Sequence, residues 1–392
     1  MKTRIKNCRI LRNGKLSLED IFINDGKFSS DFSPPYCEID ASGMIILPGA
    51  IDAHVHMREP GQEYKEDFLS GSRAGIKGGT TCFLDMPNNL ASITTTALLA
   101  DKRAHAKKSI ADYGFHFGAA DNNCDEIKKA ENIASVKCYM TETTGGLILS
   151  FPGLERIMQE TDAMLSIHVD DIKMLDKILA LSLKYEKRIH ICHVSKKEEL
   201  MLIEECKKSN KNLSCEVTPH HLFLSEKNKY MVKPPLNKTS DSEYLWEGAI
   251  NGSVDIIATD HAPHTRIERD SGMFYGIPGI ETRMPLMLDY SLKGKISMKR
   301  VVELCCTKPA EIYGIKNKGE IKEEYDADFF MFNPEAREKI KEENLETKCR
   351  WSPFNRMNIS GRIEKMFLRG NLSYERESGF SGNPGKEISY FS

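Results

Sequence analysis

The chain has 392 residues, a formal net charge of −2 and 29% charged residues. This length suits a large barrel with a second, smaller domain, and the hydrophobic fraction of 40% is typical of a globular protein. A net charge so close to zero gives no reason to expect nucleic acid or an anionic membrane as a partner.

Eleven cysteines occur without CxxC spacing, which favours free thiols in a reducing compartment. The first segment, MKTRIKNCRILRNGK, has no apolar core of signal-peptide length. No apolar run approaches the roughly 20 residues that a membrane span needs. We therefore expect a cytoplasmic protein without a membrane segment.

The first 45 residues predict short strands and turns, with Asn24-Asp25-Gly26 as a hairpin turn. Short apolar β runs then alternate with helical segments such as 96–108 and 196–208. The β runs are 51–56, 80–86, 113–119, 135–140, 164–170, 188–194, 213–219 and 254–260. About eight β segments in βα alternation predict an α/β fold, a (β/α)8 TIM-like barrel.

Helical segments follow at 281–292 and 298–314, and from about Lys316 the pattern returns to strands and turns. A β-rich start and a β-rich end predict that the N- and C-terminal segments form one small β-sandwich beside the barrel. The predicted domains are a β-sandwich from 1–45 and 316–392, and a barrel from 46–315.

Two histidines, His54 and His56, end the first barrel strand in the segment LPGAIDAHVHMREPG. Side chains alternate between the two faces of a strand, so both imidazoles point the same way. Neutral imidazole is a common metal ligand. An HxH pattern also arises by chance, so evidence for a metal site must come from residues on the other strands.

Further polar residues fall in or at the ends of other predicted strands: Lys137 in the fourth, His168 in the fifth, His193 in the sixth and Asp260 in the eighth. The carboxyl ends of barrel strands converge on one mouth. Any one of these histidines has a simpler explanation as a hydrogen-bonded core residue. Their joint placement predicts a metal centre.

Lys137 is the unusual member of this set, because an ammonium group would repel a metal cation. A carbamate formed from its amine and CO₂ would instead be an anionic ligand able to bridge two cations. Imidazole and carboxylate ligands favour Zn²⁺, with Mn²⁺, Co²⁺ or Fe²⁺ left open. Two such ions would share a hydroxide as nucleophile.

Several segments resemble the sequence signatures of the dihydroorotases, in the cyclic amidohydrolase group of the amidohydrolase superfamily. They are LPGAIDAHVHMREPG, FLDMPNN, SVKCYMTET, HICHVSKKEEL, CEVTPHHLFLS, IIATDHAPHT and GIPGIETRMPLML. The resemblance extends from about residue 40 to 375. It implies a cyclic amide hydrolase that closes N-carbamoyl-L-aspartate reversibly to L-dihydroorotate in de novo pyrimidine biosynthesis.

The resemblance also implies metal ligands: His54, His56 and Asp260 for one ion, and His168 and His193 for a second. Lys137, in K-x-Y-x-x-E-T, matches the carboxylated bridging lysine of one branch of the family. Other members bridge with an aspartate, but no TDDG-like segment follows the fourth strand here. Asp260 would also be the general acid and base, taking a proton from water and passing it to the ring nitrogen.

A substrate carboxylate needs a cationic partner, and Arg58, two residues past His56, is suited to a bidentate contact. The alternative for Arg58 is a surface salt bridge with Glu59 or Glu63. By resemblance, the other substrate contacts are Asn88, His264, Lys233, Thr143 in a loop that closes over the substrate, and the backbone of Pro278 and Gly279.

These contacts have alternatives too. Asn88 could serve only turn formation after a proline, and Pro278 and Gly279 could simply shape a loop. Lys233 stands where relatives use Arg or Asn, and the pair Thr143-Thr144 departs from relatives that have an aromatic residue after the first threonine.

A further group, Cys192, Glu216 and His264, could hold an extra metal ion. The alternative makes Cys192 a small core residue and Glu216 a hydrogen-bond partner of a ligand. No ligand role is expected for His105, His116, His190, His220, His221 and His261.

Allantoinase and dihydropyrimidinase share the barrel and most ligands, so both are alternatives. Arg58, together with MPNN and GIPGIET, favours a substrate with a free carboxylate, and hence a dihydroorotase. An inactive barrel serving as scaffold for a transcarbamoylase is a third alternative, but such a protein should have lost ligands. The expected partner is a small-molecule substrate, and a homodimer is left open because family members often form dimers.

Overall fold

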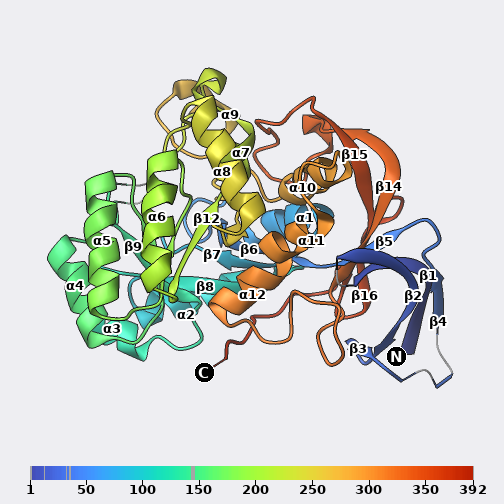
Figure 1. Ribbon diagram of the computed structural model, residues 1–392. Coiled ribbons are helices and arrows are strands. Elements are labelled where there is room, and N and C mark those ends of the chain that lie inside the picture. Colours follow the sequence, from blue (N-terminus) through green and yellow to red (C-terminus); the bar gives the residue numbers. More distant parts are fainter. Residues whose placement is uncertain (1, 13, 32, 35–36, 143–145, 392) are drawn as a thin grey trace.

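A computed structural model gives the structure of residues 2–12, 14–31, 33–34, 37–142 and 146–391. Figure 1 shows two parts: a barrel surrounded by helices, and a second sheet built from both ends of the chain. Within the described residues, no helix is long and apolar enough to cross a membrane.

The barrel is a sheet of eight parallel strands in the order of the chain. They are β6 (Ala50–Val55), β7 (Thr80–Asp85), β8 (Asp112–Gly118), β9 (Ser135–Tyr139), β10 (Leu165–His168), β11 (Ile189–Ile191), β12 (Leu213–Val217) and β13 (Ile256–Ile257). A parallel bridge from Val55 to His261 joins the last connection back to β6. Every strand overlaps a predicted β run, and the predicted barrel is confirmed.

Helices alternate with the barrel strands along the chain, and several of them cover the outside of the barrel (Figure 1). They are α1 (Phe68–Lys77), α2 (Thr96–Ala106), α3 (Cys124–Lys129), α4 (Phe151–Glu160), α5 (Ile172–Lys184), α6 (Lys197–Ser209), α7 (Pro219–Phe223), α8 (Thr239–Asn251), α9 (Arg266–Ser271), α10 (Arg283–Leu292), α11 (Met298–Val302) and α12 (Lys308–Tyr313). Short 3₁₀ turns lie at Glu226–Asn228 and Glu342–Asn344, and a π-helical turn at Glu303–Thr307.

Helix α5 shows why these segments are helical. Its buried residues Leu175, Ile178, Leu179 and Ser182 recur at intervals of three and four, which puts them on one face. The side chain of Asp171 caps its first turn by accepting a hydrogen bond from the Met174 amide at 2.7 Å. The helix therefore presents one apolar stripe to the barrel.

The second sheet has nine strands, and its order β17-β16-β15-β14-β5-β1-β2-β3, with β4 beside β1, joins both chain ends. They are β1 (Lys2–Arg12), β2 (Lys15–Asn24), β3 (Lys27–Ser29), β4 (Cys37–Asp40), β5 (Ile45–Pro48), β14 (Phe329–Lys339), β15 (Asn358–Leu368), β16 (Asn371–Glu375) and β17 (Gly379–Phe380). Strand β5 pairs antiparallel with β14 and leads directly into β6. The predicted fold class is confirmed, and the predicted boundaries at 45/46 and 315/316 stay predictions.

A buried ion cluster joins the tail of the chain to the barrel. Asp112 of β8, Asp326 and Asp328 lie close enough together to hold a cation. The ammonium of Lys318 occupies that place, at 2.7, 2.8 and 2.6 Å from the three carboxylates. The three carboxylates are therefore already neutralised in part by a side chain.

Candidate active site

The mouth of the barrel holds a cavity at the carboxyl ends of the strands. It is lined by His54, His56, Arg58, Asn88, Tyr139, His168, His193, Lys233, Asp260, Ala262, Tyr275 and Gly276. Eight of these twelve residues were predicted from the sequence as site residues. The fold thus brings them to one place, and their individual roles stay predictions.

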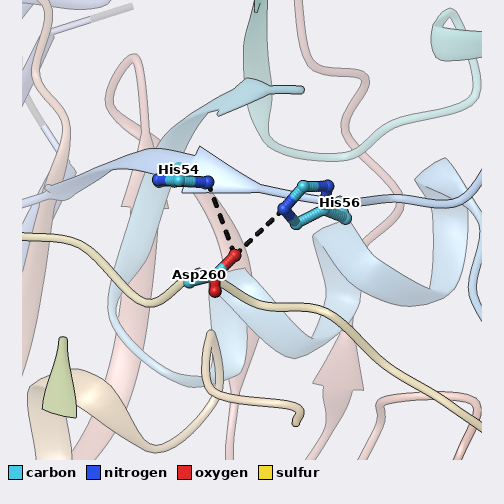
Figure 2. A group of neighbouring side chains, drawn as sticks. All are labelled: His54, His56 and Asp260. Carbon is cyan, nitrogen blue, oxygen red and sulfur yellow. Dashed lines mark hydrogen bonds and ion pairs between the residues drawn. The ribbon is translucent and has the colours of Figure 1, made fainter. Parts of the chain in front are cut away.

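His54 and His56 stand at the end of β6 with both rings turned toward Asp260, as Figure 2 shows. Their Nε2 atoms lie 3.4 and 2.9 Å from the same oxygen, Oδ1 of Asp260. All three side chains are largely buried. Two imidazole nitrogens and a carboxylate oxygen thus surround one point, as a metal ligand set requires.

The other ring nitrogen of each histidine is held by a hydrogen bond. Nδ1 of His54 lies 2.5 Å from Oε1 of Glu216, and Nδ1 of His56 lies 2.6 Å from Oδ1 of Asn88. Carboxylate and amide oxygens accept these bonds, so Nδ1 carries the proton in both rings. The Nε2 lone pair of each ring is then available to a cation.

Electrostatics support a cation at this point. Burial lowers the pKa of His56 to about 3, so its ring is neutral. Burial and the Lys137 ammonium also lower the pKa of His54, but the carboxylates of Glu216 and Asp260 outweigh them and raise it to about 10. The buried carboxylates of Glu216 and Asp260 therefore favour a positive charge between them. A metal cation would supply that charge in place of a proton.

A second pair of imidazoles lies beside the first. Nδ1 of His168, at the end of β10, is 2.8 Å from Nε2 of His193, which follows β11. Burial first, and the Lys137 ammonium for His168, lower both pKa values, that of His168 to about 3. The ring of His193 lies 5.3 Å from that of His54, centre to centre. Neutral rings this close to the first group fit a second cation.

Lys137 is fully buried in β9, with Nζ 2.8 Å from Sγ of Cys192. Its charge lowers the pKa of His54, His168 and His193. The predicted bridging role of Lys137 stays a prediction.

Three non-glycine residues of the site have left-handed backbone: Arg58 at φ 63°, His193 at φ 34° and Asp260 at φ 46°. This conformation costs on the order of 1–3 kcal/mol per residue and persists only where surrounding structure enforces it. All three follow a barrel strand closely, and all three line the cavity. The left-handed backbone at these three positions thus goes with side chains that all face the cavity.

Arg58 is buried on the cavity wall, and its Nε donates to the carbonyl oxygen of Pro263 at 3.2 Å. Within the described residues it forms no ion pair, so the predicted alternative of a salt bridge with Glu59 or Glu63 is not observed. Glu59 pairs with Lys108 at 2.7 Å instead. A buried guanidinium that has no counter-ion among the described residues is suited to bind an anion.

The remaining predicted substrate residues lie in different places. Lys233 reaches the carbonyl of Glu142 at 3.1 Å and covers the ring of Tyr275. Pro278 and Gly279 line a separate small pocket beside the cavity. Thr143 lies outside the residues that the structure describes.

The sequence profile of the amidohydrolase family matches residues 45–372, most of the chain. The chain belongs to the amidohydrolase family. Its curated relatives include the dihydroorotase of Pyrococcus horikoshii, 36% identical over 88% of this chain and 85% of that protein. The dihydroorotase of Pyrococcus abyssi is 35% identical over 97% of both chains.

Solved structures agree in fold. The L-hydantoinase (dihydropyrimidinase) from Arthrobacter aurescens superimposes with a TM-score of 0.91 over 99% of both chains at 24% identity. The dihydropyrimidinase from Brevibacillus agri gives 0.89 over the full length of both chains at 25% identity. The family match and the curated dihydroorotases confirm the predicted resemblance to the dihydroorotases and the predicted enzyme class, an amidohydrolase that acts on cyclic amides.

The predicted extra metal group of this amidohydrolase differs in one member. His54, Cys192 and Glu216 have ligand atoms within 4.8 Å of one another. His264 does not belong to this group, because its ring lies between Arg58 and Lys65. Both oxygens of Glu216 accept bonds from histidine side chains, one from His54, which agrees with a supporting role.

The six histidines expected to have no ligand role all lie outside the lining of the cavity: His105, His116, His190, His220, His221 and His261. His190, for example, lies 2.8 Å from Oγ of Ser214 and 3.1 Å from Oε2 of Glu216, and so uses both ring nitrogens within the barrel.

Sequence reasoning missed two tyrosines of the cavity wall. Tyr139 stands two residues after Lys137 on β9, so the strand period could have found it. Its buried hydroxyl has no partner among the described residues, and burial raises its pKa well above 10, so it keeps its proton. Tyr275 lies in an irregular loop after α9, where no local pattern indicates which way a side chain points.

Proposed function

We propose that this chain is a dihydroorotase that closes N-carbamoyl-L-aspartate reversibly to L-dihydroorotate. The observation that supports a carboxylate-bearing substrate is the state of Arg58. Its guanidinium is buried on the cavity wall and has no carboxylate partner among the described residues. A buried charge requires a counter-ion, and the carboxylate of either substrate would supply it. Curated dihydroorotases 35–36% identical to the chain support the same reaction.

The donor set supports two divalent cations, with Zn²⁺ as the first choice because its ligands are imidazoles and carboxylates. The ligands would be His54, His56 and Asp260 for one ion, and His168 and His193 for the other. Lys137 would bridge them as a carbamate, formed when its neutral amine attacks CO₂ and releases a proton. Bound cations would polarise the scissile carbonyl and lower the pKa of a water molecule.

Asp260 would move the proton. Burial raises its pKa, but the neighbouring His54 and His56 outweigh burial and hold the carboxyl below its usual range, so it is ionised. In hydrolysis it would accept a proton from the attacking water and give it to the ring nitrogen as the C–N bond breaks. In ring closure it would take the proton from the attacking nitrogen and return it to the departing oxygen.

The remaining residues would bind and orient the substrate. Arg58 would hold the carboxylate, and the Tyr139 hydroxyl could donate a hydrogen bond to the carbonyl oxygen as it gains charge. Further substrate contacts are proposed for Asn88, His264, Lys233, Thr143, Pro278 and Gly279. A cytoplasmic location and a homodimer belong to the same proposal.

Hydrolysis of L-dihydroorotate, dihydrouracil and allantoin by the metal-loaded enzyme, followed by absorbance, tests this function. We expect turnover of dihydroorotate alone. Turnover of dihydrouracil or allantoin in its place would contradict the carboxylate argument from Arg58 and favour a dihydropyrimidinase or an allantoinase. A chain that binds no metal and hydrolyses none of the three would be an inactive scaffold.

A further inference from the structure

A second buried cation lies directly behind the carboxylate site. The side chain of Lys65, in the loop between β6 and α1, is only 1% exposed. Its Nζ lies 2.9 Å from Oε1 of Glu268 and 3.3 Å from Nδ1 of His264. The rings of Tyr64 and Phe274 flank the ammonium. A lysine enclosed in this way has a fixed geometry.

The contacts of His264 determine which of its nitrogens carries the proton. An ammonium can only donate, so Nδ1, facing Lys65, must be the acceptor. A backbone carbonyl can only accept, and the carbonyl oxygen of Tyr275 lies 3.0 Å from Nε2 of His264, so Nε2 carries the proton. Burial, with Arg58 and Lys65 nearby, lowers the pKa of His264 to about 3, so the ring holds only this one proton.

This arrangement has a consequence for Arg58. Its Nη2 lies 3.2 Å from Nε2 of His264, a nitrogen that already carries a proton and therefore cannot accept from the guanidinium. The Nε group of Arg58 is used by the carbonyl of Pro263. Within the described residues, the terminal amino groups are thus left for a ligand in the cavity that Arg58 lines.

We propose that Lys65 is a positioning residue that fixes the tautomer of His264 and so keeps the terminal amino groups of Arg58 free for a substrate carboxylate. The proposal rests on the proposed function and adds a determinant of its specificity. Without Lys65, the His264 proton could move to Nδ1, which lies 3.5 Å from Oε2 of Glu268. Nε2 would then accept a hydrogen bond from Arg58 and hold it away from the substrate.

If Lys65 has a purely structural role, its replacement should have a different effect. In that case the lysine would serve only to neutralise Glu268, whose carboxylate accepts from the backbone amide of Thr265 at the start of α9. Loss of Lys65 would then loosen this loop and change kcat and KM together. If Lys65 acts through His264, its loss changes KM and the tautomer of the ring, because the ring lacks its donor.

The test compares metal-loaded Lys65→Met and Lys65→Arg with the unchanged enzyme. We expect the KM for dihydroorotate to rise about 10- to 100-fold in Lys65→Met, as the loss of a charged hydrogen bond implies, with kcat nearly unchanged. Lys65→Arg should recover most of the loss, because its guanidinium can still donate to Nδ1. Equal effects on kcat and KM, or no recovery in Lys65→Arg, would overturn the proposal.

A second readout needs no substrate. Imidazole ¹⁵N chemical shifts report the tautomer of His264, and we expect the proton on Nε2 in the unchanged enzyme and on Nδ1 in Lys65→Met. A proton on Nδ1 in the unchanged enzyme overturns the proposal even if Lys65→Met does not fold. This readout also separates the two hypotheses, because failure of the enzyme to act on dihydroorotate would contradict the proposed function and leave the tautomer result standing.

Lys348→Met is the matched control. Lys348 contacts the same loop, through the carbonyl of Glu63 at 2.6 Å and the carboxylate of Asp67, but no contact joins it to His264 within the described residues. We expect its KM and its His264 tautomer to equal those of the unchanged enzyme. A rise in KM like that of Lys65→Met would show that loosening the loop suffices, and would overturn the specific role of Lys65.

Discussion

The side-chain oxygen Oδ1 of Asn88 lies 2.6 Å from Nδ1 of His56 and accepts a hydrogen bond from it. The contact links the loop after β7 to the end of β6 and leaves Nε2 of His56 facing Asp260 at 2.9 Å. Asn88 lines the cavity as well, so it can serve the histidine, the substrate or both.

Replacing Asn88 by alanine should weaken metal binding about 10- to 100-fold, because the ring of His56 loses the partner that orients it. Metal titration against a competing chelator measures the effect. The exposed residue Asn371 of the second sheet gives the control variant Asn371→Ala, which should bind metal normally. A raised KM with unchanged metal affinity would instead assign Asn88 to the substrate.

Much of the site was predictable because ligand residues sit at strand ends. The β runs are short and rich in apolar residues, and polar residues such as His168 and Asp260 close them, so the barrel rule places them together. The pairing of β5 with β14 was expected only in outline, since no local pattern sets the register between segments almost 300 residues apart.

The place of His264 could not be predicted. It follows Asp260 by four residues, but the path of the chain there depends on distant contacts. The indole nitrogen of Trp351, from the segment between β14 and β15, donates to the His264 carbonyl at 2.7 Å. This contact, together with Lys65 on the other side, places the ring behind Arg58 and away from Cys192 and Glu216.

Replacing Asp260 by asparagine should lower kcat at least about 10²- to 10⁴-fold, since an amide cannot accept the proton. Metal affinity should fall too, because one ligand oxygen loses its charge, so activity must be measured at saturating metal. Asp241→Asn, at the start of α8, is a control that should keep full activity. Substantial activity in metal-saturated Asp260→Asn would contradict its role as base.

Replacing Lys137 by alanine should remove the bridging ligand and with it both metal content and activity. Short carboxylic acids should restore part of each, since they can enter the vacated space and supply two anionic oxygens. Metal analysis with and without added acetate or propionate measures this. Normal metal content in Lys137→Ala would refute the bridging role, whereas a loss that no acid restores would leave the carbamate unsupported.

Glu281 makes stability depend on pH. It is buried beside the start of α10, and burial raises its pKa to about 7, against the opposing effects of Lys77 and two backbone amides. The pKa in the unfolded chain is about 4.3, so the folded protein binds an extra proton between these values. Its free energy of unfolding therefore falls as pH rises from about 4 to 7, by at most about 3–4 kcal/mol from this group.

Glu281→Gln should remove that dependence, because the amide is neutral at every pH and its oxygen can still accept from the backbone amide of Glu346, now 2.8 Å from the carboxylate. The stability of the variant relative to the unchanged protein should be about 2–3 kcal/mol higher at pH 8 than at pH 5. Denaturant unfolding at both pH values measures the difference. Glu346→Gln, which alters a half-exposed carboxylate beside the same Lys77, should show no such change with pH. An advantage of Glu281→Gln that stays the same at pH 5 and pH 8 would mean that Glu281 is ionised in the folded protein throughout this range.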